Sequence, residues 1–363
     1  LAWLFLIYQG VTALKEVCRY SPSAGQNAFT PAHYTSLATL KILVAENDKE
    51  SGKQPSLRLW NSVHMNDPNE GACFIELLKL GCKNSQKNPQ GQNQEQEGYT
   101  LSQYFPHLNN NAENLAPING NVYITSFCQQ KDDLQMWMAY GDNAEGCSIT
   151  FADDFFYICF QIKGPLGLTE YSYKDYPLYQ VQYLDEKELL ENGRIKIVSC
   201  KKETSARCSH CGQDILREQA KTAKAKRIES CMGHIWEHIS ELLHWMDEKI
   251  GKEENGKESR ITPTTKAAVT AFVADALNEI RFLFKYSDYA DEEEMRLVRC
   301  SYQPQFEDKF PIPRMYIDVG REIQIGEVML GAKISPQEAN EIVSWLYATG
   351  KVRKVTKSQK HYK

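Results

Sequence analysis

The sequence lacks the features that mark several large classes of protein. None of its 363 residues belong to a run that reaches the roughly 20 apolar residues required for a membrane-spanning helix. Its 42 basic residues are outnumbered by 47 acidic ones, so the chain has no bulk attraction for nucleic acid or an anionic membrane. Internal repeats are also missing. We therefore expect neither a membrane protein nor a protein held to nucleic acid by its overall charge.

Four common catalytic or nucleotide-binding motifs are absent as well. The chain contains no G-x-G-x-x-G after a strand and no G-x-x-x-x-G-K-[ST]. It also has no G-x-S-x-G and no H-E-x-x-H. These absences argue against Rossmann dehydrogenases, P-loop NTPases, α/β-hydrolases and zincin proteases.

A complete disulfide framework is not expected, because the chain has an odd number of cysteines. The eleven residues are scattered, and several lie in apolar stretches such as ITSFC (124–128). This pattern favours reduced, buried thiols over the regular spacing of a small secreted scaffold. The sequence therefore predicts a cytoplasmic protein.

The first residues, LAWLFLIYQGV (1–11), are largely apolar but do not have the form of a signal peptide. No basic segment precedes them, and Tyr8, Gln9 and Lys15 interrupt the apolar character. We expect a buried helix within residues 1–28. This helix is compatible with the end of an upstream helical-repeat region.

The remaining chain alternates between strand-rich and helix-rich regions. Helical periodicity is clearest at 35–46, 71–80, 213–284 and 335–350, the third of these broken by a loop at 251–263. Strands are predicted at 56–60, 121–128, 147–151, 181–185, 195–199, 295–300, 314–319 and 327–331. We therefore expect an α+β domain over residues 29–350 with a helical insertion at about 200–284. The basic segment 351–363 is expected to be a solvated tail.

His33, Tyr34 and Thr35 stand just before the first amphipathic helix of this domain. A histidine at the end of a strand, followed by a tyrosine and a threonine, could line a cleft and hold a ribose or a phosphate. In the alternative interpretation, Thr35 or Ser36 caps the helix and the histidine is incidental. The residues alone favour the cap.

Asn66 and Asp67 follow the strand predicted at 56–60, in the stretch NDPNEG (66–71). Their polar side chains could bind a cofactor. Asn-Asp-Pro is also typical turn chemistry, and acidic groups near a helix start are favourable for structure alone.

A further group of candidates surrounds the predicted strand at 121–128. Ser126 lies on that strand, and Trp137 and Tyr140 follow it three residues apart. On a helix the two rings would share one face and could stack on a planar ligand. Ordinary core packing explains the rings equally well.

The acidic run Glu292–Glu294 leads directly into the strand predicted at 295–300. If the extended backbone begins early, Glu292, Glu294 and Arg296 point to one face and Glu293 points to the other. Two carboxylates and an arginine on one face are costly unless they are paired or functional. A solvated charge run at a strand end is the alternative.

Cysteine and histidine residues near the helical insertion have the spacing of a zinc site. Cys208-x2-Cys211 is followed, after a gap of 19 residues, by Cys231-x2-His234. Two such pairs are typical of a closed structural zinc site with four ligands. The second pair falls within a predicted helix, which argues against this assignment.

Four stretches of the chain, in order, resemble the bacterial domain family DUF2971, which is often attached to tetratricopeptide repeats. They are HYTSLATLKIL (33–43), LRLWNSVHMNDPNEG (57–71), VYITSFCQQKDDLQMWMAYGDNAEGCSITF (122–151) and IRFLFKYSDYADEEEMRLV (280–298). The same order of motifs is similar, more distantly, to the ADP-ribosyltransferase fold. That resemblance implies a split β-sheet with flanking helices and an NAD-binding cleft.

The resemblance also implies roles for individual residues. His33 matches the first element of the NAD cleft, Thr125-Ser126 the second and Glu292-x-Glu294 the third, although ITSF departs from a full Ser-Thr-Ser motif. Cleavage of the nicotinamide–ribose bond passes through an oxocarbenium-like state, which a carboxylate stabilises.

In this scheme Glu294 stabilises the positive charge, Glu292 orients the acceptor or takes its proton, and His33 with Ser126 holds ribose hydroxyls. Tyr34, Trp137 or Tyr140 would stack on a ring, and Arg296 would pair with a diphosphate or neutralise Glu294. The implied activity is that of an ADP-ribosyltransferase or NAD glycohydrolase, as in a bacterial toxin or phage-defence effector. A transferase would use NAD and an unknown macromolecular acceptor, whereas a glycohydrolase would use NAD alone.

Two other functions remain open from the residues. A metal-dependent nuclease or phosphodiesterase could use Asp67, Glu70, Glu292 and Glu294 as ligands for a divalent cation. A non-catalytic binding module would instead use the acidic cluster as an ion-pair network.

Overall fold

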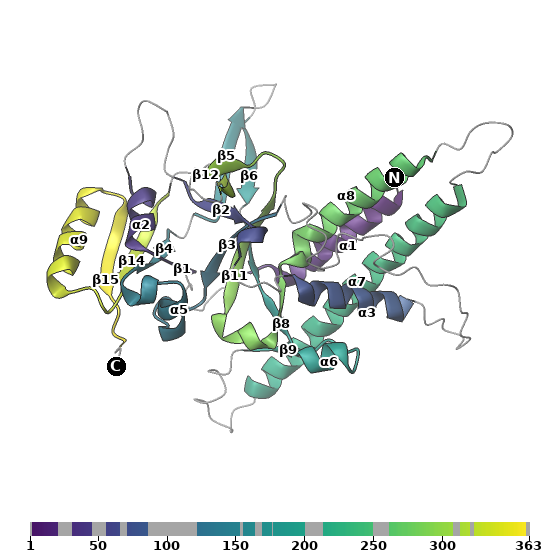
Figure 1. Cartoon of the computed structure of the whole chain (residues 1–363), viewed down its shortest axis with the longest axis horizontal. Helices are drawn as coiled ribbons and strands as arrows, with labels where there is room; N and C mark the ends of the chain where they lie inside the picture. Colours follow the sequence, from purple (N-terminus) through teal and green to yellow (C-terminus); the bar gives the residue numbers. More distant parts are fainter. Residues whose placement is uncertain are drawn as a thin grey trace.

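The chain forms a mixed α+β structure in which helices flank a large mixed β-sheet (Figure 1). The computed structural model describes residues 2–20, 31–45, 56–65, 71–85, 122–152, 155–163, 169–175, 177–199, 213–249, 261–307, 313–319 and 323–360. None of the helices in these ranges is both long enough and apolar enough to span a bilayer.

Several helices begin at residues whose side chains accept hydrogen bonds from free backbone amides. Ser36 caps α2, Asp133 caps α5 and Thr262 caps α8, and each accepts a hydrogen bond from a first-turn N–H. A capping box of Ser335 and Glu338 opens α9. The helices are α1 (Ala2–Cys18), α2 (Leu37–Leu43), α3 (Ala72–Ser85), α5 (Leu134–Ala139), α6 (Glu186–Leu190), α7 (Gln213–Lys249), α8 (Pro263–Arg281) and α9 (Pro336–Ala348).

The strands form one ten-stranded sheet and two small ones. The large sheet runs β12-β13-β2-β3-β1-β4-β14-β15, and β11 and β7 attach to β3 from its other side. Its strands are β1 (Ala32–Thr35), β2 (Arg58–Asn61), β3 (Val122–Cys128), β4 (Cys147–Phe151), β7 (Leu178–Gln180), β11 (Glu294–Cys300), β12 (Gln305–Glu307), β13 (Arg314–Asp318), β14 (Ile325–Leu330) and β15 (Val352–Lys357). The small sheets are β10 (Phe284–Tyr286), β8 (Gln182–Leu184) and β9 (Ile197–Val198), and β5 (Tyr157–Lys163) with β6 (Thr169–Asp175).

The large sheet divides at β3. Along one edge, β11 pairs antiparallel with β3 over all seven residues. Along the other edge, β2 pairs only with Tyr123 and Ile124, and β1 pairs only with Cys128. Residues 125–127 lie between these two partners, where side chains replace strand pairing: Thr125 Oγ1 donates to the Arg58 carbonyl (2.6 Å), and His33 Nδ1 bonds to the Ser126 carbonyl (2.9 Å). The divided edge therefore opens beside Ser126.

The two largest apolar cores of the described residues are built from different elements. One is helical and joins α1, α3, α7 and α8, with Val11, Leu14, Ile235 and Leu277 almost wholly buried. The other lies within the sheet and beneath α2 and α9. Figure 1 shows α1, α7 and α8 together on one side of the sheet and α9 at the opposite end. β10 and β11 follow α8 in the chain, so they run from the helical core into the sheet.

Most predicted elements are confirmed, and the prediction of a solvated tail is wrong for residues 352–357. The apolar segment at the start is helix α1, and the helices and strands predicted in the described ranges are present near their expected positions. The basic segment contains β15, which pairs in parallel with β14 at the edge of the large sheet. Val352 is buried in the sheet core while Arg353 and Lys354 remain exposed. Lysines and arginines on an edge strand discourage pairing with another chain. Because β15 is such an edge strand, its sequence resembles that of a solvated basic tail.

Candidate functional site

The register between β3 and β11 brings the central polar residues together. Ser126 lies opposite Arg296, and Cys128 lies opposite Glu294. Directly opposed residues in an antiparallel pair project from the same face of the sheet. Residues of the third stretch (122–151) and the fourth stretch (280–298) therefore meet on one surface, although Ser126 and Arg296 are 170 positions apart in the chain.

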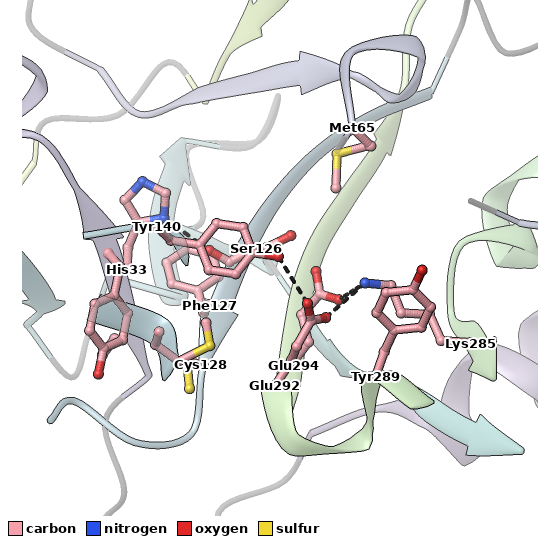
Figure 2. A pocket seen from close by; sticks show the side chains of 13 residues that line it. His33, Met65, Ser126, Phe127, Cys128, Tyr140, Lys285, Tyr289, Glu292 and Glu294 are labelled. Atoms are coloured by element: carbon pink, nitrogen blue, oxygen red, sulfur yellow. Dashed lines mark hydrogen bonds and ion pairs between the residues drawn. The ribbon is translucent and has the colours of Figure 1, made fainter. Parts of the chain in front are cut away.

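A cavity of about 190 Å³ opens on this surface. His33, Ser126 and Glu294 all line it, together with Tyr34, Tyr140 and Glu292. The remaining lining residues are Ala32, Met65, Phe127, Cys128, Met136, Lys285 and Tyr289. Figure 2 shows His33 on one side and Lys285 on the other, with Ser126 and the two glutamates between them. The resemblance implies that His33, Ser126 and Glu294 share one site, and the geometry of the cavity is consistent with that expectation.

Glu294 is held in the floor of the cavity by Arg296. The guanidinium donates from Nε to Oε1 (2.7 Å) and from Nη2 to Oε2 (2.8 Å), a bidentate pair. A third donor, Arg296 Nη1, binds the Phe282 carbonyl (2.7 Å), and the arginine side chain has no exposed surface. Burial alone would raise the pKa of Glu294, but the charges of Arg296 and Lys285 outweigh it and hold this pKa well below its usual range.

Lys285 links Glu294 to the second carboxylate. Its ammonium lies 3.0 Å from Glu294 Oε2 and 2.9 Å from Glu292 Oε2, as the dashed lines in Figure 2 mark. The other oxygen of Glu292 accepts a hydrogen bond from the Tyr140 hydroxyl (2.9 Å). Burial and the nearby Glu292 charge raise the pKa of Tyr140, so this hydroxyl stays protonated. Two carboxylates and two cations thus form one balanced cluster.

His33 and Ser126 present neutral polar atoms to the same cavity. The Ser126 carbonyl can only accept, so His33 Nδ1 carries the proton and Nε2 keeps a lone pair. Burial lowers the pKa of His33, which favours this neutral ring. The buried Ser126 hydroxyl lies close enough to Glu294 to lower its pKa further, although the two groups do not meet the geometry of a hydrogen bond.

The route by which Glu292 reaches the cavity differs from the prediction. The strand begins at Glu294, so Glu292 does not share a strand face with Glu294 and Arg296. Glu292 instead ends the 3-10 helix η6 (Ser287–Glu292), and Glu293 adopts a left-handed backbone (φ 44°). At that turn Glu293 points to Gln130 and accepts a hydrogen bond from Gln130 Nε2 (2.9 Å). Glu292 is left facing the cavity.

Three predicted ligand-binding residues do not line the cavity. Trp137 is fully buried, donates from its ring nitrogen to Asp132 (2.8 Å) and packs edge-on against Tyr34. Thr35 is the last residue of β1 and pairs with Cys147. Arg296 is sequestered by Glu294, so of its two expected roles the neutralising one fits and the diphosphate contact does not. Tyr34 does line the cavity, but its hydroxyl donates a hydrogen bond to the Gln130 carbonyl and accepts one from the Asp133 amide.

Several candidates fall outside the described residues, namely Asn66, Asp67, Glu70, Cys208 and Cys211. The other half of the expected zinc site, Cys231 and His234, lies on α7. Cys231 is half-buried near Cys18 of α1, and His234 is exposed near Gly10 of the same helix. No group of three metal-binding side chains occurs within the described ranges. The zinc site stays a prediction.

Sequence reasoning missed Lys285 and Tyr289, which complete the charged side of the cavity. The Tyr289 ring lies 5.0 Å from the Lys285 ammonium. The available signal was the position of Lys285 inside the apolar run FLFKY (282–286), since a lysine buried in such a run needs an acidic partner.

The comparisons with known proteins assign no relative to this arrangement. No family model, no curated protein and no solved structure matches the chain.

Proposed function

We propose that this protein cleaves the nicotinamide–ribose bond of NAD, as an ADP-ribosyltransferase or an NAD glycohydrolase. The observation that carries the proposal is the convergence of His33, Ser126, Tyr140, Glu292 and Glu294 on one cavity. The resemblance of the four sequence motifs to DUF2971, and of their order to ADP-ribosyltransferases, supplies the reaction. The division of the sheet beside Ser126 supports the split sheet that this resemblance implies.

The size of the cavity suits one ring of the dinucleotide. A protein cavity of about 150 Å³ accommodates benzene, and this one measures about 190 Å³. The nicotinamide end can therefore enter while the rest of the molecule extends outward. Tyr140 offers an aromatic face, and His33 Nε2 can accept a hydrogen bond from a ribose hydroxyl.

The contacts favour Glu292, not Glu294, as the carboxylate that meets the developing positive charge. Both oxygens of Glu294 bind Arg296, and one also binds Lys285. Each oxygen of Glu292 has one donor, and its side chain is 20% exposed against 7% for Glu294. Glu294 then acts as a positioning residue that anchors Lys285, which in turn orients Glu292. The charge-stabilising role expected for Glu294 from the sequence thus passes to Glu292.

A metal-dependent phosphodiesterase fits the contacts less well. The Lys285 ammonium lies between Glu292 and Glu294, in the position that a bridging divalent cation would take. The ion pairing of both carboxylates does suit a non-catalytic binding module, which remains the second candidate. Binding of NAD without release of nicotinamide would identify that module.

The test is incubation of the purified protein with NAD, with and without cell extract, and chromatography of free nicotinamide. We expect release by the wild type, a loss of at least 100-fold in Glu292→Gln, and little change in Asp288→Asn, an exposed carboxylate of the same 3-10 helix. Radiolabelled NAD would distinguish label on macromolecules from free ADP-ribose, and toxicity in cells that Glu292→Gln abolishes would support an effector role. No nicotinamide release, together with a Glu292→Gln variant that behaves like wild type in cells, would overturn the proposal.

A further inference from the structure

A second cavity measures about 230 Å³. It forms where residues 178–184 pass from the large sheet to a small one. β7 pairs with β11 in the large sheet, and β8 pairs with β10 and β9 in the small sheet. The third and fourth turns of α7 line it with Lys221 and Lys224. Ser199, Gln182 and Glu293 contribute polar groups to its wall.

The two lysines of this cavity differ in their partners. Lys221 forms an ion pair with Glu218, one turn earlier on α7 (2.9 Å). Lys224 forms no ion pair with any described residue, and its electrostatic neighbours are the Cys18 thiol and a second cation, Arg227. Burial lowers the pKa of the Lys224 amine, as expected for an ammonium that has lost water without gaining a counter-ion.

The acidic residue of the wall does not offset Lys224. Glu293 accepts a hydrogen bond from Gln130 and makes no ion pair with either lysine. Among the described residues of its wall, the cavity therefore has two cations, of which Lys224 has no carboxylate partner, against one carboxylate. Lys224 is half-buried, so its ammonium has lost part of its hydration without gaining a carboxylate partner, and an ordered anion is the ligand that would offset this loss.

We propose that this cavity binds a small phosphate-bearing anion, with Lys224 as its principal counter-ion and Lys221 and the Ser199 hydroxyl as further donors. Lysine binds phosphate as a compact point charge with three donors, so two lysines on successive turns of one helix suit it. The volume admits inorganic phosphate or a small phosphorylated molecule. The inference stands independently of the NAD chemistry proposed above.

The same segment separates the two cavities. Ala290 and Glu293 line the second, whereas Glu292 and Glu294 line the first. Tyr183, in the wall of the second, accepts a hydrogen bond from the Glu294 amide (2.9 Å). A bound anion would therefore support the segment that places both carboxylates.

The test measures thermal unfolding and calorimetric binding of the full chain with inorganic phosphate and, separately, ribose 5-phosphate, against sodium chloride at equal ionic strength. We expect a rise in Tm of roughly 3–6 °C at 100-fold excess over Kd for the better of the two probes. Lys224→Met should lose at least tenfold in affinity. Lys226→Met, which removes an exposed lysine of the same helix, should bind like wild type.

The variants also separate binding from folding. Without phosphate, Lys224→Met should unfold at the same temperature as wild type or higher, because it removes a half-buried charge that has no carboxylate partner. Lys224→Arg should retain binding of the favoured probe. The proposal is overturned if neither probe binds the wild type, if chloride gives the same stabilisation, or if Lys224→Met responds to phosphate as the wild type does.

Discussion

The floor of the first cavity is Glu294, held from beneath by the buried Arg296, and its rim includes Glu292 and Tyr140. The two glutamates belong to the same chain segment but lie in contrasting surroundings. At the floor the side chains are 7% and 0% exposed, and every carboxylate oxygen faces a cation. At the rim, Glu292 is 20% exposed and one of its two donors is a neutral hydroxyl. A sequestered carboxylate stabilises the site, whereas one with free lone pairs can respond to a ligand.

The largest expected effect is at the floor, from Arg296→Met. It leaves the Glu294 carboxylate buried with Lys285 as its remaining cation, so the free energy of unfolding should fall by about 3–5 kcal/mol. Chemical denaturation followed by circular dichroism measures the change. The matched control is the double variant Glu294→Leu/Arg296→Met, which should recover most of the loss because an apolar pair replaces the buried charges. A double variant no more stable than the single one would show that the pair itself is required.

The floor should also give the protein a specific sensitivity to acid. Because the folded pKa of Glu294 is depressed, the unfolded chain takes up this proton first, and the stabilisation is present above the ordinary glutamate pKa of about 4.3. It is lost as the pH falls from that value through the lower folded pKa, at up to about 1.4 kcal/mol per pH unit. Denaturation midpoints measured from pH 6 to pH 2.5 should therefore fall more steeply for wild type than for Glu294→Leu/Arg296→Met. Equal slopes would contradict the assignment of the shift to Glu294.

Lys285→Met breaks the link between floor and rim, and a smaller effect is expected. Glu294 keeps Arg296 and Glu292 keeps Tyr140, so the free energy of unfolding should fall by roughly 1–3 kcal/mol. Nicotinamide release should fall further than stability does, because Glu292 loses the contact that orients it. Lys196→Met, at an exposed lysine paired with Asp185, provides the surface control. Unchanged activity at the reduced stability would remove Lys285 from the positioning role.

Sequence alone predicted the parts of this comparison that depend on local pattern, and missed those that depend on distant contacts. Alternation identified β3 and β11, and the cost of two carboxylates beside Arg296 indicated that they are paired or functional. The left-handed turn at Glu293 could not be foreseen, because nothing in a run of three glutamates favours that backbone. The link through Lys285 depends on β10 pairing with β8, about 100 residues earlier in the chain. Such pairing leaves no periodic signal.

The smallest effect on stability, and the sharpest test of the comparison, is expected at the rim from Glu292→Gln. The amide keeps the size of the side chain and an acceptor for Tyr140, so the free energy of unfolding should change by less than about 1 kcal/mol. Nicotinamide release should nevertheless be lost, because a neutral amide cannot stabilise positive charge on the ribose. Glu294→Gln should show the reverse balance, with a loss of stability near that of Arg296→Met and an activity that recovers in part at low temperature, where the fold persists. If Glu294→Gln is stable and inactive while Glu292→Gln remains active, the sequence-based assignment of Glu294 as the reacting carboxylate is the correct one.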